Sequence, residues 1–148
     1  MPMDSSPKRV LVVAHRTAAT PALLDAVRER AARGPTAFTL LVPNVAHGLH
    51  RVVDAEDTDV SESEAVLELA LPLLRQAAGG EVEGIVGDPE PLAAIQDAVN
   101  LRGFDEIILS TLPARVSRWL RLDLPSKLSG LGLPVTHVEA RENTPAEA

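Results

Sequence analysis

Short apolar runs rich in Val, Ile and Leu alternate with segments of helical periodicity along almost the whole chain. The five runs occupy residues 10–14, 38–42, 82–86, 104–109 and 133–138. Continuous apolar runs of this length are typical of strands that are buried on both faces. Because a helix is expected after each of the first four strands, the pattern predicts a parallel sheet with right-handed crossovers and helices on both faces. We expect an α/β, Rossmann-like fold whose five strands lie in the order 3-2-1-4-5.

The expected helix boundaries rest on capping residues and on proline. N-caps followed within two residues by proline predict helix starts at Thr20, Asp88 and Asp123. The spacing of Ser61 and Glu64 matches a capping box and predicts the start of another helix, which Pro72 should kink or split. Residues 43–60 show no clear periodicity, so they are expected to form a long loop.

Composition restricts the class of protein. The chain has 148 residues, the size of one domain, and a net charge of -7, which argues against general binding of nucleic acid. It contains no cysteine and no apolar run of the roughly 18 residues that a membrane span needs, and its start lacks the hydrophobic segment of a signal peptide. We expect a cytoplasmic protein with a flexible N-terminus at 1–8, one domain at 9–139 and a flexible tail at 140–148.

The loop after the fourth predicted strand is the most informative stretch for function. The strand ends in Ser110 and Thr111, and three arginines and the only tryptophan, Trp119, follow in a chain that is otherwise acidic. In the expected order the connections of the first and fourth strands leave in opposite directions, and ligands of open α/β sheets bind at such a switch point. Arginines and the amides of helix starts favour an anion there. The alternative is an ordinary strand end followed by an exposed basic helix. Trp119 is expected to cover the core or to anchor an interface.

The candidate ligand-binding residues come from the strand ends and loops around this point. Those from the second and third strands are expected to contribute backbone atoms, and the others mainly hydroxyl groups and positive charge. The candidates are Ala14, His15, Arg16, Thr17, Val42, Gly87, Ser110, Thr111, Arg115, Ser117, Arg118 and Ser126.

Two other groupings of polar residues do not support a metal or catalytic site. His47 and His50 form a pair without a third ligand, and they follow the second strand, whereas the similar signature of nucleotidyltransferases follows the first. His15, Asp88 and Ser110 all fall at strand ends, so a triad is conceivable, but the sequence contains no nucleophile elbow. We therefore expect no metal site and no catalytic residue.

Several short motifs, in their order, resemble the universal stress protein family. These are GDPEPLAAIQDAVNLRGFDEIILST and the closing LPVTHV, within a resemblance that spans about residues 9–138. The resemblance implies an α/β fold of the kind also seen in adenine nucleotide alpha hydrolases. It also implies a homodimer formed through the last strand, and in one branch of the family the binding of ATP.

The chain departs from the ATP-binding branch at its glycine motif. That motif, G-x2-G-x9-G-(S/T), would place its first glycine at Ser110 and its second at Pro113, and Asp123 stands where the third belongs. Ser126 is the nearest remnant of the closing hydroxyl. The resemblance implies a stress-linked regulator that binds an adenine nucleotide, ATP or AMP, or another phosphate-bearing anion. The alternative is a nucleotide-free dimeric interaction protein of the same fold.

Overall fold

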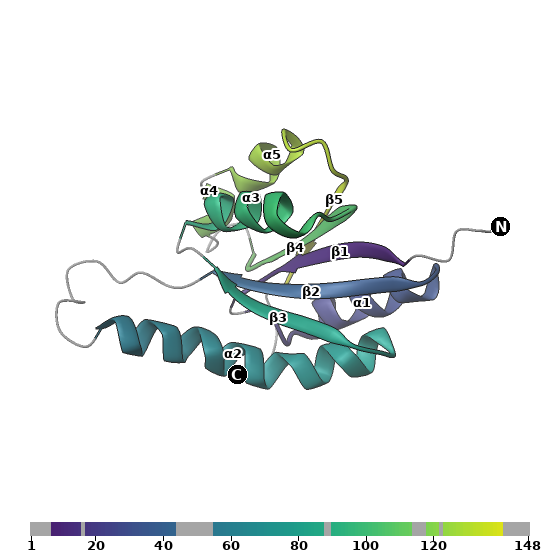
Figure 1. Cartoon of the computed structure of the whole chain (residues 1–148), viewed down its shortest axis with the longest axis horizontal. Coiled ribbons are helices and arrows are strands. Elements are labelled where there is room, and N and C mark those ends of the chain that lie inside the picture. Colours follow the sequence, from purple (N-terminus) through teal and green to yellow (C-terminus); the bar gives the residue numbers. More distant parts are fainter. Residues whose placement is uncertain are drawn as a thin grey trace.

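The sheet has the predicted topology. A computed structural model describes residues 7–15, 17–43, 55–87, 90–113, 118–121 and 123–140, without the side chains of 55–62, 118 and 121. Five parallel strands lie in the order β3-β2-β1-β4-β5, which confirms the expected 3-2-1-4-5 (Figure 1). The strands are β1 (Lys8–Val13), β2 (Thr36–Pro43), β3 (Val82–Gly87), β4 (Glu106–Thr111) and β5 (Val135–Glu139).

Helices cover both faces of the sheet, as predicted. The helices α1 (Pro21–Ala32) and α2 (Ala55–Ala78) lie on one face. The helices α3 (Pro91–Arg102), α4 (Arg118–Arg121) and α5 (Leu124–Ser129) lie on the other (Figure 1). Trp119, on α4, packs against the apolar cluster of its face, which confirms its predicted place over the core. Within the described ranges, no helix is long and apolar enough to cross a membrane.

The central strand β1 supplies both apolar clusters. Val10 and Val12 pack on the α1 and α2 face, while Leu11 and Val13 pack on the α3 and α5 face. All four are at most 1% exposed, because side chains alternate along a strand and helices cover both faces of this one. The continuous apolar run in the sequence thus reflects a strand without a solvent face.

Helix α2 begins earlier than the sequence predicted and is continuous. It starts at Ala55, so the expected loop over 43–60 is shortened and Ser61 lies inside the helix rather than at its cap. In the sequence, its first turns are rich in acidic residues. Pro72 does not split the helix. The proline is exposed, so the backbone carbonyl that loses its partner can lie on the water side.

Helix α3 begins later than predicted. Its N-cap is Glu90, with Pro91 at the first helical position, whereas the sequence favoured Asp88 and Pro89. The Glu90 carboxylate accepts a hydrogen bond from the Ala93 amide at 3.2 Å. The stretch contains two acidic residues that each precede a proline, and the capping rule alone does not distinguish them.

A glycine in β3 allows α2 to lie close to the sheet. A Cβ atom at Gly84 would stand 2.8 Å from Leu67 Cδ2 and 2.9 Å from Leu71 Cδ1, both on α2. Such distances are shorter than carbon atoms tolerate, so a side chain here would push the helix outward or force these leucines to move. The glycine that interrupts the third apolar run therefore serves helix packing.

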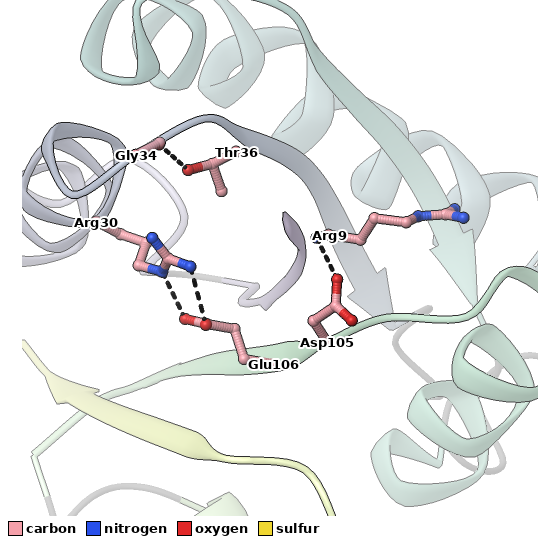
Figure 2. Close-up of polar contacts among 6 residues, drawn as sticks. All are labelled: Arg9, Arg30, Gly34, Thr36, Asp105 and Glu106. Atoms are coloured by element: carbon pink, nitrogen blue, oxygen red, sulfur yellow. Dashed lines mark hydrogen bonds and ion pairs between the residues drawn. The ribbon is translucent and has the colours of Figure 1, made fainter. Parts of the chain in front are cut away.

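A largely buried ion pair ties α1 to the amino end of β4. Arg30 Nε donates to Glu106 Oε2 at 2.8 Å and Arg30 Nη2 donates to Glu106 Oε1 at 3.1 Å (Figure 2). The side chains are 10% and 19% exposed. The hydrogen bond to Glu106 and the attraction between the charges raise the pKa of Arg30, against the opposing effect of burial. Next to this pair, the Arg9 amide donates to Asp105 Oδ2 at 2.8 Å, which joins β1 to the start of β4.

Replacing Glu106 by glutamine should lower the free energy of unfolding by about 3 kcal/mol, because the Arg30 charge would stay buried without its counter-ion. The matched control is Asp25→Asn, which breaks the Arg28–Asp25 pair whose side chains are 61% and 67% exposed. This control should cost less than about 0.5 kcal/mol. Urea denaturation measures both values. Equal losses in the two variants would contradict the role given to the buried pair.

Candidate functional site

The carboxyl ends of β1 and β4 meet at the predicted switch point. In the parallel registers, Val13 faces Leu41 of β2 on one side and Leu109 of β4 on the other. The Ala14 amide continues the ladder by donating to the Leu41 carbonyl at 3.2 Å. β2 and β3 lie on one side of β1, and β4 and β5 lie on the other. The loops that follow β1 and β4 therefore lie at the position where open α/β sheets bind ligands.

The turn between β1 and α1 is held by its own hydrogen bonds. The Thr17 carbonyl accepts from the Thr20 amide at 3.2 Å and from the Thr20 hydroxyl at 2.9 Å. The Ala18 amide donates to the His15 carbonyl at 3.2 Å. Thr20 is the N-cap of α1, as predicted, but its hydroxyl points back to the turn and does not cap the helix. The turn is therefore compact, and it projects Thr17 toward β4.

Two candidate hydroxyl groups meet across the switch point. The Thr17 Oγ1 and Ser110 Oγ atoms lie 2.6 Å apart, although 93 positions separate the residues in the sequence. Thr17 is 2% exposed and Ser110 is 1% exposed. The prediction placed both residues here, and the structure brings them together. Sequence reasoning missed that the two hydroxyls bind each other.

The neighbouring hydroxyl, Thr111, points to the other face of β4. Its Oγ1 donates to the Leu112 carbonyl at 2.9 Å and lies 2.8 Å from Nε2 of His137 on β5. Which of the two groups donates in this contact depends on the tautomer of His137. Residues adjacent in a strand face opposite ways, so Ser110 and Thr111 do not act on one ligand group from the same side. The sequence indicated the contact with His137 only weakly, because it showed no more than that His137 lies in the strand expected next to β4.

The second and third strands bring Val42 and Gly87 to the same edge of the sheet. Val42 is fully buried, backbone included, so it offers no surface to a ligand in this structure. Gly87 is the last residue of β3, and a Cβ atom there would stand 2.8 Å from Leu41 Cδ1 and 2.9 Å from Ala94 Cβ. Because α3 approaches this closely, the glycine is required for packing whatever else it contacts.

The remaining candidates are not joined to these contacts within the described residues. Ser126 is exposed on α5, and Arg118 begins α4. Arg16, Arg115 and Ser117 lie outside the described residues, as do His47, His50 and Asp88. Their assignment to a ligand site stays a prediction. Among the residues that the structure describes, no three His, Asp or Glu side chains are grouped in a way that could hold a metal ion.

Sequence reasoning also missed Glu90 at this edge. Its carboxylate accepts a hydrogen bond from the Ala93 amide at the start of α3. A negative charge already at this helix terminus disfavours a second anion there.

Several solved structures that share this architecture are universal stress proteins. The chain superposes on a universal stress protein from Archaeoglobus fulgidus with a TM-score of 0.64 and 17% identity, over 88% of this chain and 93% of that one. The chain has the universal stress protein fold. A family member from Arabidopsis thaliana with AMP bound gives a TM-score of 0.64 at 15% identity, over 95% and 97% of the two chains. The fold expected from the resemblance is thereby confirmed.

Further structures of the same fold contain adenine nucleotides. A universal stress protein from Archaeoglobus fulgidus in complex with dAMP matches with a TM-score of 0.59 at 18% identity, over 91% of this chain and 99% of that one. No family model matches the sequence, and no curated protein matches it significantly. The likeness therefore lies in the three-dimensional arrangement rather than in shared residues.

Replacing Thr17 by valine should lower the free energy of unfolding by about 1–2 kcal/mol, because the Ser110 hydroxyl would stay buried without a partner. Ser110→Ala should have a similar effect. In the double variant, the loss should be smaller than the sum of the two single losses by about 1 kcal/mol, since neither hydroxyl is then left alone. A double-mutant cycle by urea denaturation measures this coupling, and strictly additive losses would contradict the contact.

Proposed function

We propose that this protein binds an adenine nucleotide at the carboxyl ends of β1 and β4 and acts as a universal stress protein-like cytoplasmic regulator. The observation that supports it most is the match, over 95% of the chain, to a universal stress protein family member with AMP bound. That protein is only 15% identical, so the ligand is a proposal for this chain.

The geometry supports a distribution of roles along the sheet edge. The backbone of Gly87, the last residue of β3, would contact the uncharged part of the nucleotide. The phosphate would lie over the hydroxyl pair of Thr17 and Ser110. Two arginines enter the proposal only through their place in the sequence: Arg16, next to this turn, and Arg115, shortly after β4. Arginine binds phosphate through charge-assisted hydrogen bonds, which can substitute for missing backbone donors.

Titration calorimetry with AMP, ATP and cyclic AMP tests the proposal. Arg115→Ala should weaken the binding of the nucleotide by ~1.5–3 kcal/mol, the range of a hydrogen bond to a charged group. Arg28→Ala, which removes an exposed arginine of α1 paired with Asp25, is the matched control and should leave the affinity unchanged. Absence of heat from all three nucleotides at millimolar concentration would reject the proposed function. Unchanged affinity in Arg115→Ala alone would remove only that residue.

A second candidate function, a dimeric interaction protein, is favoured by the edge strand β5. The Ile107 amide bonds to the Pro134 carbonyl, and the Ala140 amide bonds to the Thr111 carbonyl. In a parallel ladder this alternation directs the amide and carbonyl groups of the intervening odd-numbered residues, such as Val135 and His137, away from β4. A strand edge of this kind can pair with the same strand of a second copy. We propose that two chains associate in this way, whether or not a nucleotide binds.

Replacing His137 by proline should convert a dimer to a monomer, since proline removes an amide on the outer edge without breaking the ladder to β4. It also removes the hydrogen bond to Thr111. Thr111→Val removes the same side-chain bond but keeps the edge amide, so this control should remain dimeric. Light scattering after size-exclusion chromatography measures the mass against the 15.7 kDa of one chain. A monomeric parent protein, or a dimeric His137→Pro variant, would reject the edge pairing.

A further inference from the structure

An uncharged stripe runs along the exposed side of α2, the long helix that lies below β3 on the outside of the molecule in Figure 1. Leu69 is 67% exposed and Leu73 is 38% exposed. The two leucines are four positions apart, so they lie on consecutive turns of the same side of the helix. Exposed, uncharged neighbours extend the stripe in both directions along α2, and these are Ala65, Pro72 and Gln76.

The two leucines of the stripe are not needed to build the core of the chain. The face of α2 that packs on the sheet is made of other residues, including Ala70, Leu74 and Ala77, which are at most 7% exposed. A helix at the surface of a globular protein needs one such apolar face, and its opposite face is usually polar. Leucines on consecutive turns of the outward face therefore indicate a surface that another molecule covers.

The charges beside the stripe match a second copy of α2 that lies in the antiparallel direction. Glu68 and Arg75 are both exposed and seven positions apart, so two helical turns separate them on the same side of the helix. A two-fold axis midway between Leu69 and Leu73 places each leucine against the other leucine of the second copy. The midpoint between Glu68 and Arg75 lies almost at the same point. The same axis therefore brings each glutamate to the arginine of the second copy.

Arg75 has donors to spare for such a contact. Its Nε atom donates to the Val82 carbonyl at 3.3 Å and lies 3.9 Å from Glu81 Oε1. The Arg75 side chain is 46% exposed and that of Glu81 is 97% exposed, so this pairing contributes little. A guanidinium group has five N–H donors, and its two terminal nitrogens can still bind a carboxylate.

We propose that this stripe is a self-association surface on which α2 of a second copy lies antiparallel, with leucine against leucine and Glu68 against Arg75. The contact is separate from the edge of β5, because α2 packs on β2 and β3 at the other end of the strand order. Glu64 and Glu68 beside the stripe disfavour a membrane surface, whose anionic lipids attract basic side chains. So few residues bury less than the about 1,200 Å² of a stable interface, so the association is weak and depends on concentration.

Sedimentation velocity of the full-length protein between about 10 μM and about 1 mM tests the proposal, since weak contacts dissociate in this range. The mass should at least double as the concentration rises, whether the starting species is a monomer or a dimer joined through β5. Leu69→Lys should raise the Kd of this step by about tenfold or more, because a two-fold interface contains the position twice. Leu101→Lys is the matched control, because it changes an 84% exposed leucine of α3, and it should leave the step unchanged.

Charge reversal tests the antiparallel orientation. Glu68→Arg and Arg75→Glu should each weaken the association, because like charges then face each other across the axis. The two substitutions in one chain should restore the Kd to within about threefold of the parent value, since opposite charges meet again. Within one helix the two positions lie about 10 Å apart, beyond the reach of the usual pairs along a helix, so restoration reports a contact between copies.

Three results would overturn the proposal. The first is a constant mass over the whole concentration range, which would mean that a different partner covers the stripe. The second is a doubling that persists in Leu69→Lys, and its loss in His137→Pro would then assign the association to β5. The third is a failure of the combined charge reversal to restore what each single reversal removes. None of these results depends on whether calorimetry detects a nucleotide.

Discussion

The burial of β1 on both faces and along both edges is the constraint on which the rest of the molecule depends. Its side chains at Val10 and Val12 complete one apolar cluster, and those at Leu11 and Val13 complete the other. The backbone of β1 also forms two hydrogen-bonded ladders, one with β2 and one with β4. Because the strand has no solvent face, both helical layers must be present before its apolar surface is covered. The contacts at the start of β4, such as that between Arg9 and Asp105, then align the strands that carry the site.

The same arrangement limits what the site can be. With β1 at the centre, the ends of β1 and β4 are adjacent, and residues far apart in the sequence come within hydrogen-bonding distance. The alternation of side chains along β4 then assigns Ser110 to the turn after β1 and Thr111 to the edge strand. The hydroxyl groups that follow this strand are thus divided between two faces. At the start of α3, on the same edge of the sheet, the Glu90 carboxylate accepts a hydrogen bond from the Ala93 amide.

Much of the fold was predictable because hydrophobic periodicity and strand burial are local properties of the sequence. The five strands and the helical layers followed from apolar runs and from the handedness of crossovers, and the strand order is one that such doubly wound sheets commonly adopt. Helix starts were less certain. Two acidic residues precede prolines before α3, and the capping rule does not say that Glu90 is the one whose carboxylate reaches a helix amide. The start of α2 was misplaced because its first turns are acidic and lack the apolar repeat by which the rest of the helix was found.

The sequence by itself determined the class of architecture, the position of the switch point and the types of residue that surround it, since these depend on composition and order along the chain. Only the tertiary structure decided which of those residues touch. The contact of Thr17 with Ser110 and that of Thr111 with His137 depend on the register of neighbouring strands and on the face to which each side chain turns. Register is a property of strands paired in space, so hydroxyl groups that the sequence presents as available to a ligand can be bound to each other in the folded protein.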